Sequence, residues 1–268
     1  MERRRFLRIA GGSLVVGSGV ATISFAGSDG VSALVAGSLQ RVASKLGDAT
    51  VEAHGSVAVR RLVVSGARDP DVVALADPTL VAGLASRATV FATNALVIAY
   101  NPESPFADAL ERDWRSALRR EELVVGRTDP NRDPLGYRTV MALGLAGERD
   151  LLDKTRVVPE TQLLRNLEGG AFDAAFAYRN MAVGHGVPFV SLPDELDFSN
   201  PTFSNNYATA SVELPERTVR GAPIRYAATA LTEAGRPWVE KLVSGRERLR
   251  SAGFAVPESY PTRIRVRD

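Results

Sequence analysis

Residues 126–139 carry the pattern best suited to holding a ligand, because charged and rigid residues follow a short apolar run. The run at residues 123–125 predicts a buried strand, and residues 137–145 turn apolar with helical spacing. Pro134 suits the first position of that helix and Asp133 suits the N-cap before it. This order aims free backbone N–H groups past the strand end, where an anion could bind. The same pattern also fits a capped helix that holds no ligand.

Two Gly-Ser pairs occupy comparable positions earlier in the chain. Short apolar runs at residues 31–35 and 51–53 predict strands, and the pairs containing Ser38 and Ser56 follow them. In an open α/β sheet, ligands bind beyond the carboxyl ends of the strands. Each Ser alone could equally be a turn or N-cap residue, but together they offer donors at one edge of a sheet.

The elements needed to position these residues alternate along the chain. Strands at 31–35, 51–53 and 70–76 alternate with helices at 39–46 and 57–64, which predicts an α/β fold with a mostly parallel sheet. A β-rich run at residues 90–100 predicts a strand that crosses between two lobes. Runs at 207–212 and 224–229 predict strands that return to the first lobe, and 236–251 predicts a closing helix. We therefore assign residues 27–95 and 208–268 to lobe 1 and residues 96–207 to lobe 2.

Composition limits the classes of function. The 268 residues are 45% hydrophobic and 24% charged, which suits one large domain or two lobes. Four of the 33 basic and one of the 31 acidic residues lie in residues 1–26, so the remainder carries a net charge of −1. That balance argues against nucleic-acid binding. The absence of Cys excludes disulfides, thiolate metal sites, a Cys nucleophile and a lipid-modified N-terminal Cys.

The first 26 residues read as an export signal. Residues 3–8 (RRRFLR) match the twin-arginine pattern, and a mildly apolar, Gly-rich run follows them. Small residues at 24 and 26 offer a cleavage site before Gly27. An uncleaved anchor or a basic tail is the alternative. No other segment reaches the roughly 18 apolar residues that a membrane span needs. We expect a periplasmic, cell-surface or extracellular protein.

Enzymatic and cation-binding functions have little support. The two histidines are His54, near Ser56, and His185, in a Gly-His-Gly turn. A hydrolase would need His54 beside Ser56 and an orienting acid, and an acid–base pair would use Asp129 with Asp133. The mature chain has no metalloprotease motif, nucleophile elbow or phosphate-binding loop. We expect no enzyme activity.

Several motifs occur in the order and spacing of one known family. They are residues 36–39 (AGSL), 52–58 (EAHGSVA), 74–77 (ALAD), 129–139 (DPNRDPLGYRT) and 176–183 (FAYRNMAV). Together they resemble the archaeal-type tungstate/molybdate substrate-binding proteins of ABC transporters. The resemblance covers residues 31–258.

The resemblance implies a type II periplasmic-binding-protein fold, in which two α/β lobes joined by crossing strands close over one tetrahedral oxyanion. It implies donors from both lobes: Ser38 and Ser56 in lobe 1, and Leu135, Gly136, Thr161, Gln162 and Tyr178 in lobe 2. It implies no cofactor besides the tungstate or molybdate ligand. The implied partners are ABC permease and ATPase subunits. We expect a monomer that meets the membrane only through the transporter or an uncleaved signal.

One position departs from the family. Its members bring two carboxylates to the metal of the oxyanion, which expands the coordination from four oxygens toward six. Asp133 corresponds to one of them and is a candidate ligand to Mo or W, but Ala177 replaces the Glu before the Tyr-Arg pair. We predict a tetrahedral or five-coordinate centre. Asp133 would then repel the anion unless it ligates, is protonated or faces a donor such as Arg138.

The missing Glu leaves two alternatives open. Relaxed selectivity would allow another oxyanion such as sulfate to bind. Alternatively, the protein is an exported sensor or interaction module that has lost tight oxyanion binding.

Overall fold

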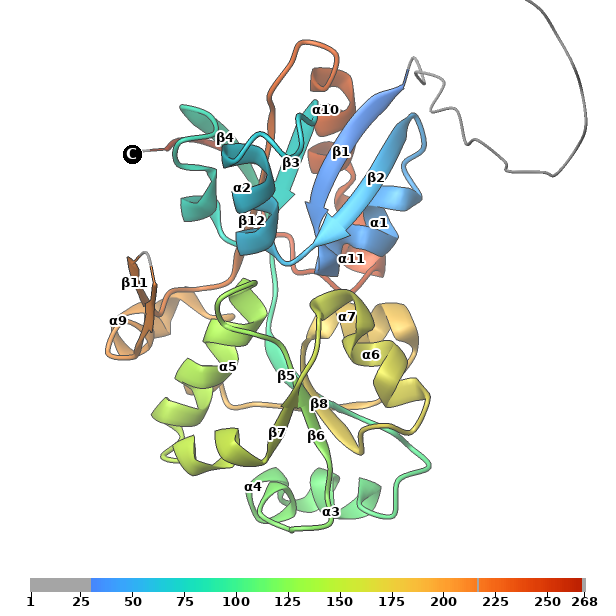
Figure 1. Ribbon diagram of the computed structural model, residues 1–268, viewed down its shortest axis with the longest axis vertical. Helices are drawn as coiled ribbons and strands as arrows, with labels where there is room; N and C mark the ends of the chain where they lie inside the picture. The colour runs from blue at the N-terminus through green and yellow to red at the C-terminus, as the bar shows by residue number, and fades with distance from the viewer. Residues whose placement is uncertain (1–29, 216, 267–268) are drawn as a thin grey trace, which may run out of the picture.

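The computed structural model describes residues 30–215 and 217–266, which form two α/β lobes stacked along the long axis of the molecule (Figure 1). The predicted signal at residues 1–26 lies outside the described residues. Among the residues described, no helix is long and apolar enough to cross a membrane. The predicted architecture of two lobes with mostly parallel sheets is confirmed.

Lobe 1 is built on a six-stranded sheet in the order β13-β4-β12-β3-β1-β2. The strands are β1 (Val31–Ala36), β2 (Ala49–His54), β3 (Val72–Leu75), β4 (Arg87–Thr93), β12 (Arg225–Ala230) and β13 (Thr262–Arg265). Strand β1 pairs in parallel with β2 and β3, while β12 runs antiparallel between β3 and β4. Every residue of β3 is buried, as expected of a central strand covered on both faces.

Short helices follow the parallel strands of lobe 1. They are η1 (Gly37–Leu39), α1 (Gln40–Ser44), α2 (Ser56–Val64) and η2 (Pro78–Val81), with α10 (Arg236–Ser244) and α11 (Arg246–Ser251) near the C-terminus. The predicted single helix at 236–251 is wrong in one respect, because Gly245 separates α10 from α11. The helices α1 and α2 begin where β1 and β2 end, so their N-termini lie at one edge of the sheet.

Lobe 2 contains a five-stranded sheet in the order β7-β6-β8-β5-β9. Its strands are β5 (Leu96–Tyr100), β6 (Val125–Arg127), β7 (Thr155–Val157), β8 (Ala174–Tyr178) and β9 (Phe189–Ser191). Its helices are α3 (Ala107–Arg112), α4 (Trp114–Leu118), α5 (Pro134–Leu145), η3 (Arg149–Lys154), α6 (Glu160–Glu168), α7 (Arg179–His185) and α8 (Asp194–Asp197). Asp133 caps α5 and Pro134 takes its first position, as predicted.

The chain crosses between the lobes at Asn94 and Ala95. The predicted long strand at 90–100 is therefore two strands, β4 and β5, that belong to different sheets. The Asn94 side chain accepts hydrogen bonds from the N–H groups of Ala95 (3.0 Å) and Asn180 (3.3 Å). These bonds hold the crossing against the start of α7 in lobe 2.

The return to lobe 1 differs from the prediction. The predicted strand at 207–212 begins too early, because Tyr207 ends α9 (Ser204–Tyr207), which follows η4 (Pro201–Phe203). The next strands, β10 (Ser211–Leu214) and β11 (Arg217–Arg220), form a separate hairpin that packs against α5 of lobe 2 (Figure 1). The rings of Phe198 and Tyr207 contact each other before this segment, with their centroids 4.7 Å apart and their planes tilted by 35°. The chain thus re-enters lobe 1 after Gly221, not at residue 208.

Candidate functional site

Ser38 and Ser56 lie at the ends of the neighbouring strands β1 and β2, on the side of lobe 1 that meets lobe 2. Both are buried. The phenol of Tyr226 donates to Ser38 Oγ at 3.1 Å, and the N–H of Ala76 donates to Ser56 Oγ at 3.0 Å. A hydroxyl has one proton to donate. Ser56 Oγ already accepts a bond from the protein, so its hydroxyl proton is available to another acceptor, such as an anion. The Ser38 side chain, in contrast, also hydrogen-bonds the Glu160 carboxylate.

The hydrogen bond to Ser38 has a defined direction. Asn94 donates through Nδ2 to Tyr226 Oη at 3.1 Å and to Asn180 Oδ1 at 2.7 Å. Since Tyr226 Oη accepts from Asn94, its own proton goes to Ser38. A chain of hydrogen bonds thereby joins the lobe crossing at Asn94 to the hydroxyl of Ser38.

Tyr178, at the end of β8, offers a third hydroxyl. Arg138 donates through Nη1 to Tyr178 Oη at 2.7 Å and to the Ala76 carbonyl at 3.0 Å. Burial raises the pKa of Tyr178 well above its usual value, so the phenol keeps its proton. The rings of Tyr178 and Tyr226 pack edge to face at 6.3 Å. The hydroxyls of Ser38, Ser56 and Tyr178, hereafter the hydroxyl cluster, are therefore linked through shared partners.

Asp133 is a buried carboxylate at the start of α5. Its Oδ1 accepts from Thr128 Oγ1 at 2.7 Å and from Gly136 N–H at 2.8 Å. Burial outweighs these bonds and raises the pKa of Asp133 to about 7. Asp133 is therefore protonated in a large share of molecules at neutral pH.

The predicted donors in α5 face Asp133 in this structure. The Gly136 N–H bonds its carboxylate, and the Leu135 N–H also lowers the pKa of Asp133 by hydrogen bonding. Arg138, a suggested partner of Asp133, instead contacts Ala76 and Tyr178. That the N–H groups of Leu135 and Gly136 donate hydrogen bonds to an anion stays a prediction. It requires these N–H groups to bond the anion as well as the Asp133 carboxylate.

Glu160 is a site residue that the sequence analysis missed. It begins α6 in lobe 2, and its carboxylate accepts from the N–H groups of Gly37 (3.1 Å) and Ser38 (3.2 Å) in lobe 1. Burial and the charge of Asp133 raise the pKa of Glu160 well above its usual range. The sequence does place an acidic residue, Glu160, at the start of a helix that follows a strand, which could have indicated a site residue. Acidic residues are common in the first turn of any helix, so this signal alone did not identify it.

The two predicted residues after Glu160 are placed differently. Thr161 is half-buried and lines a groove between the lobes. Gln162 is exposed, and its N–H donates to the Pro159 carbonyl at 2.9 Å. The prediction that Gln162 donates to a ligand thus has no support in this geometry, because the turn at the start of α6 uses its N–H.

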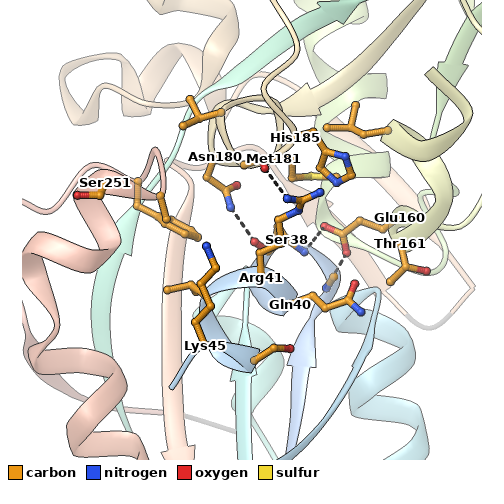
Figure 2. Close-up of a pocket in the computed structure, with 18 of the residues that line it drawn as sticks. Ser38, Gln40, Arg41, Lys45, Glu160, Thr161, Asn180, Met181, His185 and Ser251 are labelled. Carbon is orange, nitrogen blue, oxygen red and sulfur yellow. Dashed lines mark hydrogen bonds between the residues drawn. The ribbon is translucent and has the colours of Figure 1, made fainter. Parts of the chain in front are cut away.

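The lobes are closed on each other. Ala58 N–H donates to the Arg132 carbonyl at 3.0 Å, and Tyr137 Oη donates to Asp77 Oδ2 at 2.5 Å. Gly55 makes the closest approach, since a Cβ there would lie 2.4 Å from the Arg132 carbonyl oxygen and 2.6 Å from Asp133 Cβ. Figure 2 shows Asn180 and Glu160 of lobe 2 directed at Ser38 and its neighbours in lobe 1.

The candidate nucleophile–base pair of Ser56 and His54 is not assembled. His54 Nε2 bonds Glu52 at 2.7 Å, while Ser56 Oγ bonds Ala76, so the two do not form a nucleophile–base pair. Asp129 accepts from the backbone and side chain of Asn131, which is a turn contact. Within residues 30–215 and 217–266 there is no group of three or more His, Cys, Asp or Glu side chains that could hold a metal ion.

The loss of a metal ligand at Ala177 stays a prediction. Ala177 is fully buried in β8 and pairs with Val97 of β5. The two carboxylates at this site are instead Asp133 and Glu160, whose charges interact.

Comparison with known proteins gives the family. Residues 43–255 match the family model described as bacterial extracellular solute-binding protein. A Haloferax volcanii protein named as an ABC transporter molybdenum-binding protein is 43% identical over 97% of this chain and 93% of its own length. The molybdate/tungstate-binding protein WtpA of Pyrococcus abyssi is 32% identical over 68% of this chain and 65% of its own length.

Solved structures agree on the fold. The periplasmic molybdate-binding protein of Azotobacter vinelandii superimposes with a TM-score of 0.61 at 16% identity, covering 85% of this chain and 100% of that protein. Peb3 from Campylobacter jejuni gives a TM-score of 0.54 at 10% identity, with coverages of 85% and 100%. At these identities the match concerns the two-lobed architecture alone.

Proposed function

Because the chain belongs to the family of bacterial extracellular solute-binding proteins, we propose that it captures a tetrahedral oxyanion, molybdate or tungstate, between its lobes and delivers it to an ABC transporter. The relatives named for molybdenum, molybdate or tungstate support this choice of ligand. ABC permease and ATPase subunits are the proposed partners, and the protein acts as a monomeric binding protein without enzyme activity.

One observation carries the proposal: the hydroxyls of Ser56 and Tyr178 each accept a bond from the protein and so keep a proton to donate. The hydroxyl of Ser38 belongs to the same cluster and bonds the Glu160 carboxylate in this structure. Neutral donors suit a fully ionised oxyanion, which accepts hydrogen bonds at every oxygen and has no proton to give. Each such bond to a charged group contributes about 1.5–3 kcal/mol. Several of them allow micromolar to nanomolar binding after the cost of closure is subtracted.

The charges at the site favour proton uptake with the anion. A dianion beside two ionised, buried carboxylates would be strongly repelled. The raised pKa values of Asp133 and Glu160 make their neutral forms accessible. A protonated carboxyl group also donates a hydrogen bond, so protonation replaces repulsion with another donor.

Closure couples the two lobes through the ligand. Ser38 and Ser56 belong to lobe 1 and Tyr178 belongs to lobe 2, so only the closed state brings all three hydroxyls to one anion. The bonds from Asn180 and Arg138 to lobe 1 carbonyls stabilise the same state. Export by the twin-arginine route, with residues 1–26 as the signal, places this capture outside the cytoplasm.

Thermal unfolding of the purified protein with about 1 mM molybdate, tungstate, sulfate or phosphate tests the proposal. At that concentration, an anion bound with micromolar affinity would add roughly 4 kcal/mol to the free energy of unfolding. Each kcal/mol raises the unfolding temperature of a chain of this size by about 2–4 °C. We expect a large shift with molybdate and tungstate, and its loss in Ser56→Ala. An equal shift with sulfate would mean relaxed selectivity. No shift with any oxyanion would favour the exported sensor or interaction module.

A further inference from the structure

A groove of about 670 Å³ opens between the lobes beside the hydroxyl cluster (Figure 2). The helices α1 and α11 of lobe 1 and α6 and α7 of lobe 2 line it. Ser38 and Glu160 lie at its buried end and belong to the site already described. Its volume is within the range of small-molecule sites, so an oxyanion could enter it with its water shell.

Four cationic side chains line the groove: Arg41, Lys45, Arg165 and Arg248. All four are exposed, and they come from both lobes. Among the described residues that line the groove, Glu160 is the one carboxylate, and it is buried and bonded to Gly37 and Ser38. In the part of the chain that the structure describes, none of the four cations forms an ion pair with a carboxylate.

Their donors are mostly uncommitted. Arg41 donates through Nη1 to the Gly184 carbonyl at 2.6 Å, and Arg248 donates to the Lys241 carbonyl at 3.4 Å. A guanidinium has five N–H donors, so most of those on Arg41 and Arg248 remain for a ligand. Figure 2 shows the Arg41 side chain directed at α7 near His185.

The hydroxyl cluster itself attracts an anion poorly from a distance. Among the residues that the structure describes, Arg138 is the cation that bonds this cluster, and the neighbouring Asp77 opposes its charge. Burial works against ionisation of Asp77, but Arg138 and bonds from Tyr137 and Thr79 lower its pKa, so it stays charged. Asp133 and Glu160 add negative charge whenever they ionise. Long-range attraction must therefore come from outside the cluster.

We propose that Arg41, Lys45, Arg165 and Arg248 form an outer anion site that binds a divalent oxyanion weakly at the mouth of the cleft and passes it to the hydroxyl cluster. This inference rests on the proposed function. Clefts lined by one sign of charge raise association rates by factors of about 10 to 1,000, and salt weakens the effect. The outer site thus sets how fast the anion arrives, while the hydroxyl cluster sets how long it stays.

A triple variant separates the two roles. Lys45→Gln, Arg165→Gln and Arg248→Gln together remove three charges and keep Arg41, which bridges the lobes. The matched control is Arg112→Gln, Arg149→Gln and Arg156→Gln, three exposed residues of lobe 2 that do not line the groove. We would measure molybdate association and dissociation rates by rapid mixing in about 20 mM and 200 mM NaCl.

We expect the groove variant to associate about tenfold more slowly than wild type at low salt, with a flatter salt dependence and an unchanged dissociation rate. The control should stay within about twofold of wild type. Both triple variants lose three positive charges, but only one of them loses charges in the groove. Equal association rates in the two would overturn the outer site, because the position of the charges would then have no effect. A change confined to the dissociation rate would overturn it too.

A second readout does not depend on the hydroxyl cluster. Crystals of wild type and of the groove variant would be soaked in selenate, whose selenium scatters anomalously. A peak among the groove cations in wild type but not in the variant supports the outer site, even if no anion reaches Ser38 and Ser56. Absence of a groove peak in wild type would overturn it. Failure of the proposed function would appear separately, as an empty hydroxyl cluster.

Discussion

Arg138 Nη1 and Tyr178 Oη lie 2.7 Å apart, and the guanidinium is the donor of this bond. The arginine cannot accept, so the phenol proton must point elsewhere. The same guanidinium donates to the Ala76 carbonyl in lobe 1, which links Tyr178 to the closed state. Arg138 therefore orients a neutral donor through its Nη1 group.

Replacing Tyr178 by Phe tests this arrangement. The variant loses one donor to the anion, which should weaken molybdate binding by about 1.5–3 kcal/mol, or roughly 10- to 150-fold in Kd by calorimetry. Tyr100→Phe is the control, because Tyr100 donates to Glu111 away from the cleft. An unchanged Kd in Tyr178→Phe, with binding intact in the control, would remove the phenol from the site.

Closure should depend on Gly55. An Ala there would place its Cβ 2.4 Å from the Arg132 carbonyl oxygen, so the lobes could not meet as they do here. The backbone at Gly55 has φ −59°, which Ala adopts without strain, so lobe 1 should fold normally. We expect molybdate affinity to fall at least about tenfold and scattering to report an open shape with ligand.

The control for that experiment is Gly144→Ala in α5, where an added Cβ meets nothing within 4 Å. It should bind normally and be as stable as wild type or slightly more so. Normal closure and affinity in Gly55→Ala would mean that the backbone can shift enough to admit a methyl group.

The stability of the ligand-free protein should depend on Asp133 between about pH 4 and 7. Burial raises the folded-state pKa of Asp133 to about 7, well above the ordinary value of an aspartate. A raised pKa means that the folded protein holds the proton more tightly than the unfolded chain does. The protonated Asp133 therefore contributes to the free energy of unfolding, and this contribution is fully present below pH 4 and is lost as the pH rises through 7. Asp133→Asn keeps the acceptor for Thr128 and Gly136 but does not titrate.

Denaturant unfolding of both proteins across this window measures the effect. The stability difference between wild type and Asp133→Asn should shift in favour of the variant as the pH rises. Molybdate should also bind wild type more tightly at pH 6 than at pH 8. A pH-independent difference would show that Asp133 is not protonated in the folded protein.

The coordination of the bound metal provides a fourth test. With Ala177 in β8 and Glu160 directed at Gly37 and Ser38, only Asp133 is predicted to ligate. X-ray absorption of the molybdate or tungstate complex should therefore show four short metal–oxygen distances and at most one longer one. Six oxygen ligands would contradict this and would make Glu160 the second carboxylate.

The sequence predicts what depends on local pattern. The cap at Asp133 and Pro134 and the serines at the ends of β1 and β2 follow from turn chemistry and alternation of strand and helix. The hydrogen-bond partner of a buried side chain cannot be predicted from local pattern, because it depends on how the two lobes pack against each other. Glu160 reads as a helix-start residue, and its bonds to Gly37 and Ser38 span more than 120 positions. The predicted strand at 207–212 is wrong for the same reason, because the hairpin of β10 and β11 packs against α5 of lobe 2 and not in the sheet of lobe 1.

The connectivity of lobe 1 affects how the chain folds during synthesis. Strand β12, at residues 225–230, lies between β3 and β4, so the two halves of the sheet stay unjoined until the last fifth of the chain has emerged. The sheet of lobe 2, in contrast, comes from the continuous stretch 96–191. We therefore expect lobe 2 to resist protease in released chains that end at residue 215, while lobe 1 is cut. Lobe 1 would then complete its fold only after its C-terminal strands have been released from the ribosome.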